Sequence, residues 1–441
     1  MTLVSLSGAF SHGDTEASVT TAVRAGIATD PVHGAVVPPT VLSSNFTFRR
    51  FGEKRRFDYS RSGNPTRALL EETLARLEGG AGAVCVASGM AAATLVAHWL
   101  GPNRRLLASH DLYGGCHRLF CALRDRGVLD VTFVDFTDPS SWRPAVAAGC
   151  ALVWVETPSN PLLRVTDVDA VATAAHDAGA KVVVDNTFLS PVNQRPIDLG
   201  ADFVVHSTTK SINGHSDVVG GAVVAACPDD AEALDHWCNC LGLSQSPADC
   251  AQILRGARTL HARWACHERN ARAVATLLEA HPAVARVHYP GLATSPYHAL
   301  ASRQQRGFGS VVSFDLHAAG EATLATFFER LQLFSLAESL GGVESLAAHP
   351  ATMTHLSMTA AAREAAGIGP SLIRLSVGIE APEDLLADLQ SALDAVGHES
   401  AVDGRGKTPA VERSTRRRES NKAAAAPQGF RRSHSYSCRP R

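Results

Sequence analysis

The chain has 441 residues, of which 45% are hydrophobic and 19% charged, and its formal net charge is −2. This composition is typical of a globular protein with sizeable cores and gives no reason to expect a nucleic-acid partner. No run of about 18 apolar residues occurs, so no membrane span is expected. Residues 1–16 lack the basic start and apolar centre of a secretory signal. We therefore expect a cytoplasmic protein.

The cysteines do not follow a disulfide or zinc pattern. Ten cysteines are spread over the chain, and several, such as Cys85 and Cys150, lie in apolar runs typical of small core residues in a reducing compartment. Cys238 and Cys240 are too close together for the usual zinc-binding spacing and have no partner pair nearby. No metal site is expected.

Strands and helices alternate through the first half of the chain. A helix is expected to begin at Asn64-Pro65, with Pro in its first turn, and to end at Gly79. Strands are expected at 83–87, 105–109, 131–134, 150–155, 181–185, 202–206 and 220–226. Helices are expected at 91–100, 116–126, 167–179 and 194–199. This order predicts an α/β fold with a mostly parallel sheet covered by helices on both faces.

The pattern changes near residue 260. A long helix at 263–281 is followed by strands near 285–289 and 309–316 and by helices near 320–331 and 382–396, which predicts a smaller C-terminal α+β domain. The chain thus divides into an N-terminal arm, a large domain, a small domain and a tail. Their expected boundaries are 1–62, 63–259, 260–397 and 398–441.

Three strand ends carry candidate site residues. After the expected strand at 202–206, Ser207 and Thr209 precede Lys210, a lysine suited to a Schiff base with an aldehyde cofactor. Asp185 ends another buried strand, where a carboxylate can face a pyridine nitrogen. Ser88-Gly89-Met90 precedes a helix, where free N–H groups can hold a phosphate. Taken singly, each also has a structural reading: a snorkelling lysine, a turn-capping aspartate and an ordinary small-residue turn.

These features occur together with further motifs, and the chain as a whole resembles the Cys/Met-metabolism family of enzymes, which use pyridoxal 5'-phosphate and have the aspartate-aminotransferase-like fold (fold type I). The resemblance covers about residues 21–397. It is carried by the segments 58–67, 77–80, 111–115, 156–161, 204–217, 336–345 and 373–380.

The resemblance implies roles for the cofactor-site residues. Lys210 is expected to hold the cofactor and shuttle protons, Asp185 to face the pyridine nitrogen, and Tyr113 to stack on the ring and assist proton transfer. The phosphate is expected to be held by Gly89, Met90, Ser207 and Thr209. Tyr59 and Arg61 are expected to reach the phosphate of a neighbouring subunit, so that the active sites are shared within a dimer. The resemblance further implies a homotetramer built as a dimer of dimers.

The resemblance also implies substrate contacts. Arg374 is expected to clamp the α-carboxylate of an amino acid, assisted by Asn160 and Ser339. Glu338 and Asp58 are expected near the thiol substrate, where carboxylates would attract an ammonium group. The chain departs from common family patterns at Ser62, His117 and Ser211, and the arginine missing at Ser62 leaves the acyl group of the substrate open.

The expected reaction is γ-replacement, in which an activated homoserine ester and L-cysteine give L-cystathionine for methionine biosynthesis. A γ-lyase or an O-acylhomoserine sulfhydrylase on the same scaffold remains an alternative. The tail suggests an alternative function of a different class, because residues 398–441 are basic: they contain eleven Lys and Arg against four Asp and Glu. Such a segment cannot form a core and is expected to be disordered. A catalytically silent protein acting through this basic tail would retain the fold without the reaction.

Overall fold

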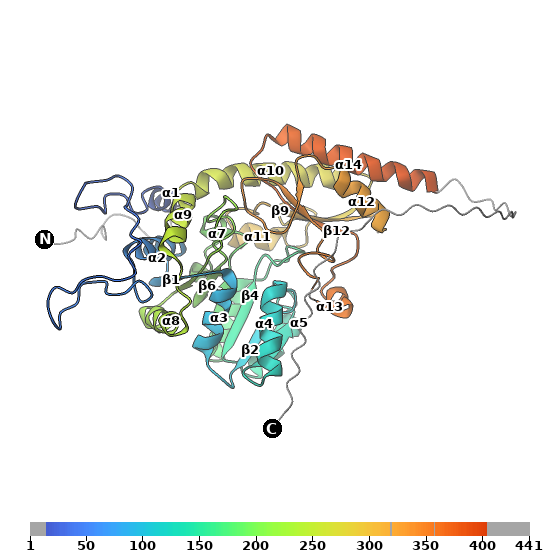
Figure 1. Ribbon diagram of the computed structural model, residues 1–441. Helices are drawn as coiled ribbons and strands as arrows, with labels where there is room; N and C mark the ends of the chain where they lie inside the picture. Colours follow the sequence, from blue (N-terminus) through green and yellow to red (C-terminus); the bar gives the residue numbers. More distant parts are fainter. Residues whose placement is uncertain (1–14, 318–319, 357, 404–441) are drawn as a thin grey trace, which may run out of the picture.

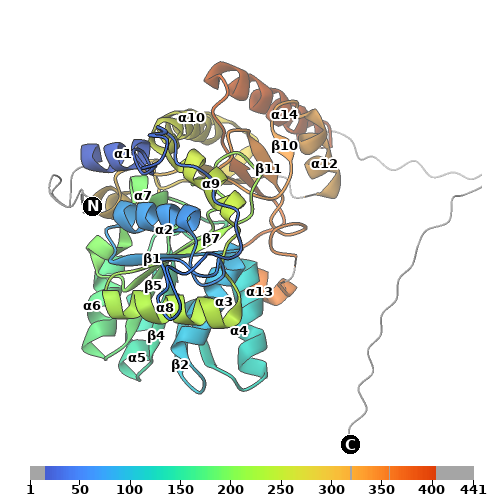
Figure 2. The ribbon, with the colours of Figure 1, turned by 60° about the vertical axis from the view of Figure 1, so that its left-hand side comes forward.

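The computed structural model describes residues 15–317, 320–356 and 358–403. Figures 1 and 2 show a large domain, coloured blue to green, and a small domain, coloured yellow to red, joined by the long helix α10 (Leu260–Ala280). The segment that precedes α2, drawn in dark blue, extends from the large domain at the left of Figure 1.

The large domain is built on a seven-stranded sheet in the order β1-β7-β6-β5-β4-β2-β3. Only β7 runs antiparallel to its neighbours; the other pairings in this sheet are parallel. The strands are β1 (Gly82–Val86), β2 (Arg105–Ser109), β3 (Asp130–Val134), β4 (Leu152–Glu156), β5 (Lys181–Asp185), β6 (Phe203–His206) and β7 (Gly221–Ala225).

Helices cover both faces of this sheet because its strands are apolar on both sides. In β5, Val183 packs into one core cluster while Val182 and Val184 pack into another on the opposite face. This alternation follows from the two-residue period of a strand. The helices of this domain are α1 (Thr15–Val23), α2 (Pro65–Glu78), α3 (Gly89–Leu100), α4 (Gly114–Asp125), α5 (Pro139–Ala147), α6 (Val168–Asp177), α7 (Ser190–Asn193), the 3-10 helix η1 (Pro196–Leu199), α8 (Pro228–Leu241) and α9 (Pro247–Ala257).

The small domain has a five-stranded sheet in the order β10-β11-β12-β9-β8. Helix α10 joins the two cores, because Leu260 and Trp264 pack in the large domain and Ala271 to Leu278 pack in the small one. The strands are β8 (Val284–His288), β9 (Val311–Leu316), β10 (Ser335–Leu336), β11 (Leu346–Ala348) and β12 (Leu372–Ser376). The remaining helices are α11 (His298–Gln304), α12 (Glu321–Arg330), α13 (Ala360–Ala365) and α14 (Pro382–Asp403).

The α/β architecture and the smaller second domain are as the sequence predicts, but the predicted tail boundary is wrong. Helix α14 continues to Asp403, six residues beyond Gly397, and residues 404–441 lie outside the described part of the chain. The nine cysteines that the structure describes are free thiols. Among the described residues, no helix is long and apolar enough to cross a membrane.

Candidate active site

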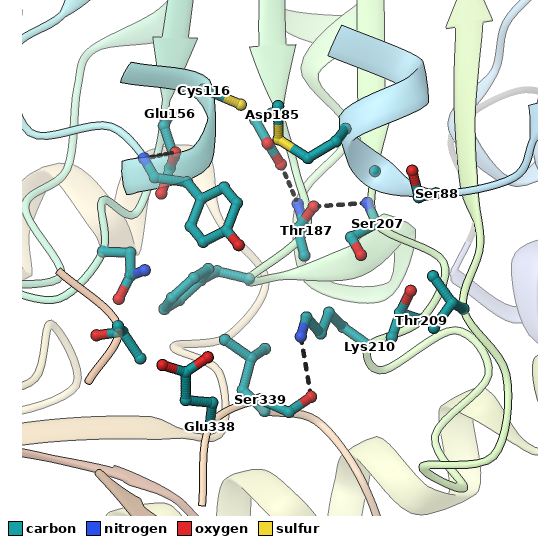
Figure 3. A pocket seen from close by; sticks show the side chains of 18 of the residues that line it. Ser88, Cys116, Glu156, Asp185, Thr187, Ser207, Thr209, Lys210, Glu338 and Ser339 are labelled. Carbon is teal, nitrogen blue, oxygen red and sulfur yellow. Dashed lines mark hydrogen bonds between the residues drawn. The ribbon is translucent and has the colours of Figure 1, made fainter. Parts of the chain in front are cut away.

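A cavity of about 410 Å³ opens where the parallel strands of the large sheet end and the small domain begins. Its size is within the range of small-molecule sites, and Figure 3 shows Asp185 and Lys210 on opposite sides of it. Of the residues that the sequence predicts, the cavity is lined by Gly89, Met90, Tyr113, Asn160, Asp185, Ser207, Thr209, Lys210, Glu338, Ser339 and Arg374.

Lys210 reaches the cavity from the turn that follows β6. Its Nζ donates a hydrogen bond to Oγ of Ser339, 2.9 Å away. Burial, with a smaller contribution from the positive charge of Arg374, lowers the pKa of Lys210 to about 8. A lysine with this pKa is neutral in a larger fraction near neutral pH than an exposed lysine, and its neutral form is a nucleophile and a base.

Asp185 lies at the end of β5 and accepts a hydrogen bond from the backbone N–H of Thr187 at 3.0 Å. Burial raises the pKa of this carboxyl. Glu156, at the end of β4, is also buried, and it accepts a hydrogen bond from the backbone N–H of Tyr113 at 2.7 Å. Burial and the nearby Asp185 raise the pKa of Glu156 well above its usual range. A cationic partner inside the cavity would stabilise the ionised form of Asp185.

The N-terminus of α3 forms another part of the cavity wall, which we call the α3 cradle. Ser88 caps this helix by accepting a hydrogen bond from the backbone N–H of Ala91 at 3.0 Å. A Cβ atom at Gly89 would lie 2.9 Å from Cβ of Ser207, and one at Gly221 would lie 2.2 Å from the carbonyl oxygen of Ser88. At both glycines the backbone therefore packs against neighbouring segments more closely than a side chain would permit, and the first N–H groups of α3 are placed for an anion.

Arg374, on β12, forms the small-domain wall of the cavity. Its guanidinium donates to Oδ1 of Asn160 at 2.8 Å and to the carbonyl of Ser339 at 3.0 Å. Its Nε is buried and has no hydrogen-bond partner among the described residues. Burial lowers the pKa of Arg374 to about 10, so the side chain remains cationic at neutral pH. A buried cation with an unused donor is suited to binding a carboxylate.

Comparison with known proteins identifies the family. The model of the family described as "Cys/Met metabolism PLP-dependent enzyme" matches residues 19–394. The chain belongs to this family. It is 50% identical to cystathionine gamma-synthase of Escherichia coli over 382 residues, which is 86% of this chain and 99% of the relative. It is 46% identical to cystathionine gamma-lyase of Dictyostelium discoideum, with 85% and 97% of the two chains covered.

A solved structure supports the same family assignment. The crystal structure of cystathionine gamma synthase from Xanthomonas oryzae pv. oryzae, in complex with aminoacrylate and cysteine, is 56% identical and superposes with a TM-score of 0.85. The superposition covers 86% of this chain and 98% of that one. The fold-type-I architecture and the dependence on pyridoxal phosphate that the sequence predicts are thereby confirmed.

The cavity fits the cofactor of this family. The α3 cradle and Ser207 suit a phosphate, and the buried carboxyl of Asp185 suits a protonated ring nitrogen. Lys210 is placed to reach an aldehyde between these two ends (Figure 3). The hydroxyl of Thr209 donates to the carbonyl of Gly220 at 3.1 Å and accepts from its N–H at 2.9 Å, so it also holds the turn that carries Lys210.

Three of the predicted site residues do not line the cavity of their own chain. Asp58, Tyr59 and Arg61 lie on the N-terminal arm, where Asp58 pairs with Lys54 and Arg61 donates to Asn239. The side chain of Tyr59 is exposed. Their contribution to a neighbouring subunit, which the family resemblance implies, stays a prediction.

The departures from common family patterns fall into different environments. Ser62 is also on the exposed arm and bonds to Asp58 and Tyr59. Ser211 is buried against Gly341, where a Cβ atom on that glycine would lie 2.4 Å from the serine Oγ. His117 stacks on Phe133 with a centroid distance of 4.6 Å and does not line the cavity.

Sequence reasoning missed several residues of the cavity wall. Glu156 carried a signal, since it ends a buried strand just as Asp185 does. Thr187 and Cys116 follow Asp185 and Tyr113 closely in the sequence, but nothing in the sequence indicates which way their side chains point. The lining residues that were missed are Cys116, Glu156, Thr187, Phe188, Val219, Leu340 and Thr354, whereas Ser88 belongs to the predicted Ser88-Gly89-Met90 turn.

Proposed function

We propose that the chain is a cystathionine γ-synthase, which joins O-succinylhomoserine or another O-acylhomoserine to L-cysteine and releases the acyl group as a carboxylate. The observation that carries the proposal is that Arg374 and Glu338 line the same cavity. A reaction between two amino acids needs a cationic contact for the carboxylate of one substrate and benefits from an anionic contact for the ammonium group of the other. The identities to the gamma-synthases of E. coli and X. oryzae support the same assignment.

Bound pyridoxal phosphate supplies an electron-withdrawing ring that makes the α- and β-hydrogens of an amino acid substrate acidic. Asp185 would hold this ring, because its carboxylate would keep the ring nitrogen protonated. Lys210 Nζ, once free, takes a proton from Cα and moves protons at Cβ. Tyr113, which lines the cavity, would contact the ring and assist these transfers.

Substrate orientation decides which bond breaks. Arg374, held by Asn160 and Ser339, fixes the α-carboxylate, so that Cα lies in reach of Lys210. The bond from Cγ to the ester oxygen breaks, and the thiol sulfur of cysteine forms the new bond to Cγ as the thiol proton is released. Glu338 attracts the ammonium group of that cysteine. The products are L-cystathionine and the free acyl carboxylate, such as succinate.

We further propose that the protein is a cytoplasmic homotetramer with shared sites. Support comes from the arm, where large hydrophobic side chains are exposed on a single chain and would be covered by a second copy. These are Val32, Val36, Val37, Leu42, Phe48, Phe51 and Tyr59. Mixing inactive Lys210→Ala chains with inactive Arg61→Ala chains tests this arrangement. Regained activity in the mixture supports shared sites, and no regain contradicts them.

The function is tested by incubating the cofactor-loaded protein with O-succinylhomoserine and L-cysteine and identifying the products by mass spectrometry. Cystathionine and succinate in equal amounts support the proposal. O-acetylhomoserine in a parallel reaction identifies the preferred acyl group, and sulfide in place of cysteine tests for a sulfhydrylase. If 2-oxobutyrate forms instead of cystathionine, the assignment moves to a lyase. If Lys210→Ala leaves the biological function unchanged, the protein works without catalysis.

A further inference from the structure

A buried histidine of the small domain bonds to the backbone of a substrate-site residue in the large domain. His355 is 1% exposed, and its Nε2 lies 3.2 Å from the carbonyl oxygen of Asn160. Its Nδ1 lies 2.8 Å from the hydroxyl of Thr354, a residue that lines the cavity. Because a carbonyl oxygen only accepts, Nε2 carries the hydrogen and Nδ1 accepts from the threonine hydroxyl.

The neutral form of His355 matches this bonding pattern. Burial, with a smaller contribution from the positive charge of Arg374, lowers the pKa of His355 to about 4. The imidazole is therefore neutral at physiological pH, with one donor and one acceptor, and both are used. A fully satisfied buried polar group holds its partners in a defined geometry.

The bond from His355 holds Asn160, the residue that contacts Arg374. Asn160 accepts a hydrogen bond from Arg374 at its side chain and one from His355 at its backbone. Since a guanidinium only donates, Oδ1 of Asn160 must face Arg374 and the amide NH₂ must face away from it. Ser313 on β9 donates to the carbonyl of the next residue, Pro161, at 2.6 Å. Small-domain side chains thus hold this turn at three points.

We propose that His355 is a positioning residue for the carboxylate of the amino acid substrate, acting through Asn160 on Arg374. The inference rests on the proposed role of Arg374 in binding that carboxylate. Without His355, the buried carbonyl of Asn160 loses its donor, the turn shifts, and Arg374 loses a fixed partner. The expected consequence is weaker binding of ligands that carry a carboxylate, with the cofactor site unaffected.

The chain contains a matched control six residues earlier in the same segment. His349 is 8% exposed; its Nδ1 lies 2.8 Å from the hydroxyl of Thr352 and its Nε2 lies 3.0 Å from the carbonyl of Pro370. It has the same kind of partners as His355, a threonine hydroxyl and a backbone carbonyl. Neither His349 nor Pro370 lines the cavity, so removing His349 reports the structural cost of losing such a histidine.

The test compares glycine with methylamine as ligands of the cofactor-loaded protein. Both carry an amine that can replace Lys210 at the cofactor, but only glycine has a carboxylate. Dissociation constants are measured from the change in cofactor absorbance for the wild type, His355→Leu, His355→Gln and His349→Leu. The melting temperature of each variant is recorded as well.

We expect His355→Leu to raise the dissociation constant of glycine about tenfold, the size expected for losing a buried hydrogen bond. The dissociation constant of methylamine should stay within about twofold, well below that effect. His355→Gln, whose amide can still donate to the carbonyl, should restore much of the affinity for glycine. His349→Leu should lower the melting temperature without separating the two ligands.

Other results overturn the proposal. They are an unchanged affinity for glycine in His355→Leu, an equal loss for glycine and methylamine, or an equal effect of His349→Leu on glycine. If His355→Leu does not fold, His355→Gln is compared with the wild type instead. A folded His355→Gln protein that no longer prefers glycine over methylamine contradicts the expected rescue by a donating side chain. An error in the proposed function would instead appear as a different product from O-acylhomoserine and cysteine, while the preference for glycine over methylamine persisted.

Discussion

Lys210 and Ser339 join the two domains across the cavity, with Nζ of the lysine donating to Oγ of the serine at 2.9 Å. Lys210 belongs to the large domain and Ser339 to the loop after β10 of the small domain. Ser339 adopts a positive φ of 99°, a conformation that costs a non-glycine residue free energy. Its carbonyl also accepts from Arg374. One strained residue therefore contacts both Lys210 and Arg374.

Two substitutions of Ser339 test the effect of its hydroxyl separately from the effect of its backbone conformation. Ser339→Ala and Ser339→Gly both remove the acceptor for Lys210, so both should lower kcat/KM by about three- to tenfold. Glycine also relieves the positive φ, and the Gly variant should therefore be about 1 kcal/mol more stable than the Ala variant in urea unfolding. Equal kcat/KM in wild type and Ser339→Ala would rule out a role for the hydroxyl.

Shortening Arg374 should chiefly weaken substrate binding. Arg374→Ala removes a buried cation bonded to Asn160 and Ser339, and a lost clamp of this kind costs on the order of 2–5 kcal/mol. Arg374→Lys keeps the charge but cannot make both contacts, so its loss should be smaller. Steady-state kinetics with O-succinylhomoserine measure KM and kcat for each. An unchanged KM in Arg374→Ala contradicts the role.

The lowered pKa of Lys210 should appear in the stability of the cofactor-free protein. Between about pH 8 in the folded state and about 10.4 in the unfolded state, the unfolded chain binds more protons at this residue. The free energy of unfolding therefore rises with pH through this window, because the cost of the buried charge is relieved. Below the window, both states are protonated and the cost is fully present.

The control for this pH dependence is Lys210→Met, which has no charge to bury. Urea unfolding of both cofactor-free proteins between about pH 7 and pH 10.5 measures the difference. The variant should be more stable than the wild type at the acid end, and the two curves should converge as the pH rises. Parallel curves would show that Lys210 titrates at its usual pKa in the folded protein.

Glu338 and Asp58 should act on the choice of thiol. Glu338→Gln and Asp58→Asn remove negative charge without changing shape, so kcat/KM for L-cysteine should fall by about tenfold for Glu338→Gln and less for Asp58→Asn, which lies on the exposed arm. The control thiol is 3-mercaptopropionate, which lacks the ammonium group. Its kcat/KM should be unchanged or higher in both variants. A parallel loss for the two thiols would indicate that these carboxylates do not select cysteine.

The strands of the large sheet could be located from the sequence because they are buried on both faces and read as continuous apolar runs. β5 and β6, for example, lie within one residue of their expected bounds. Helices α5, α8 and α9 were not predicted. In α5, Pro144 lies inside the helix, and α8 contains three Asp, two Cys and one Asn, so helix propensity is weak and tertiary packing decides. The antiparallel direction of β7 has no signal in its own sequence.

The residues of the candidate site that follow strand ends could be predicted from the sequence. Asp185 and Lys210 follow strands that are adjacent and parallel, so their convergence follows from the fold. The contacts between domains could not be predicted in this way. The bond from His355 to Asn160 joins residues 195 positions apart, and it depends on how the small domain packs against the large one. The same is true of the bond between Lys210 and Ser339.

The most direct test of the account measures the two directions of cystathionine chemistry in one preparation. The cofactor-loaded protein is given O-succinylhomoserine with L-cysteine in one reaction and L-cystathionine alone in another, and the initial rates are compared. The account predicts that cystathionine formation is the faster reaction, with little cleavage to cysteine and 2-oxobutyrate. Faster cleavage than formation would contradict the γ-synthase assignment, although the fold and the cofactor site would stand.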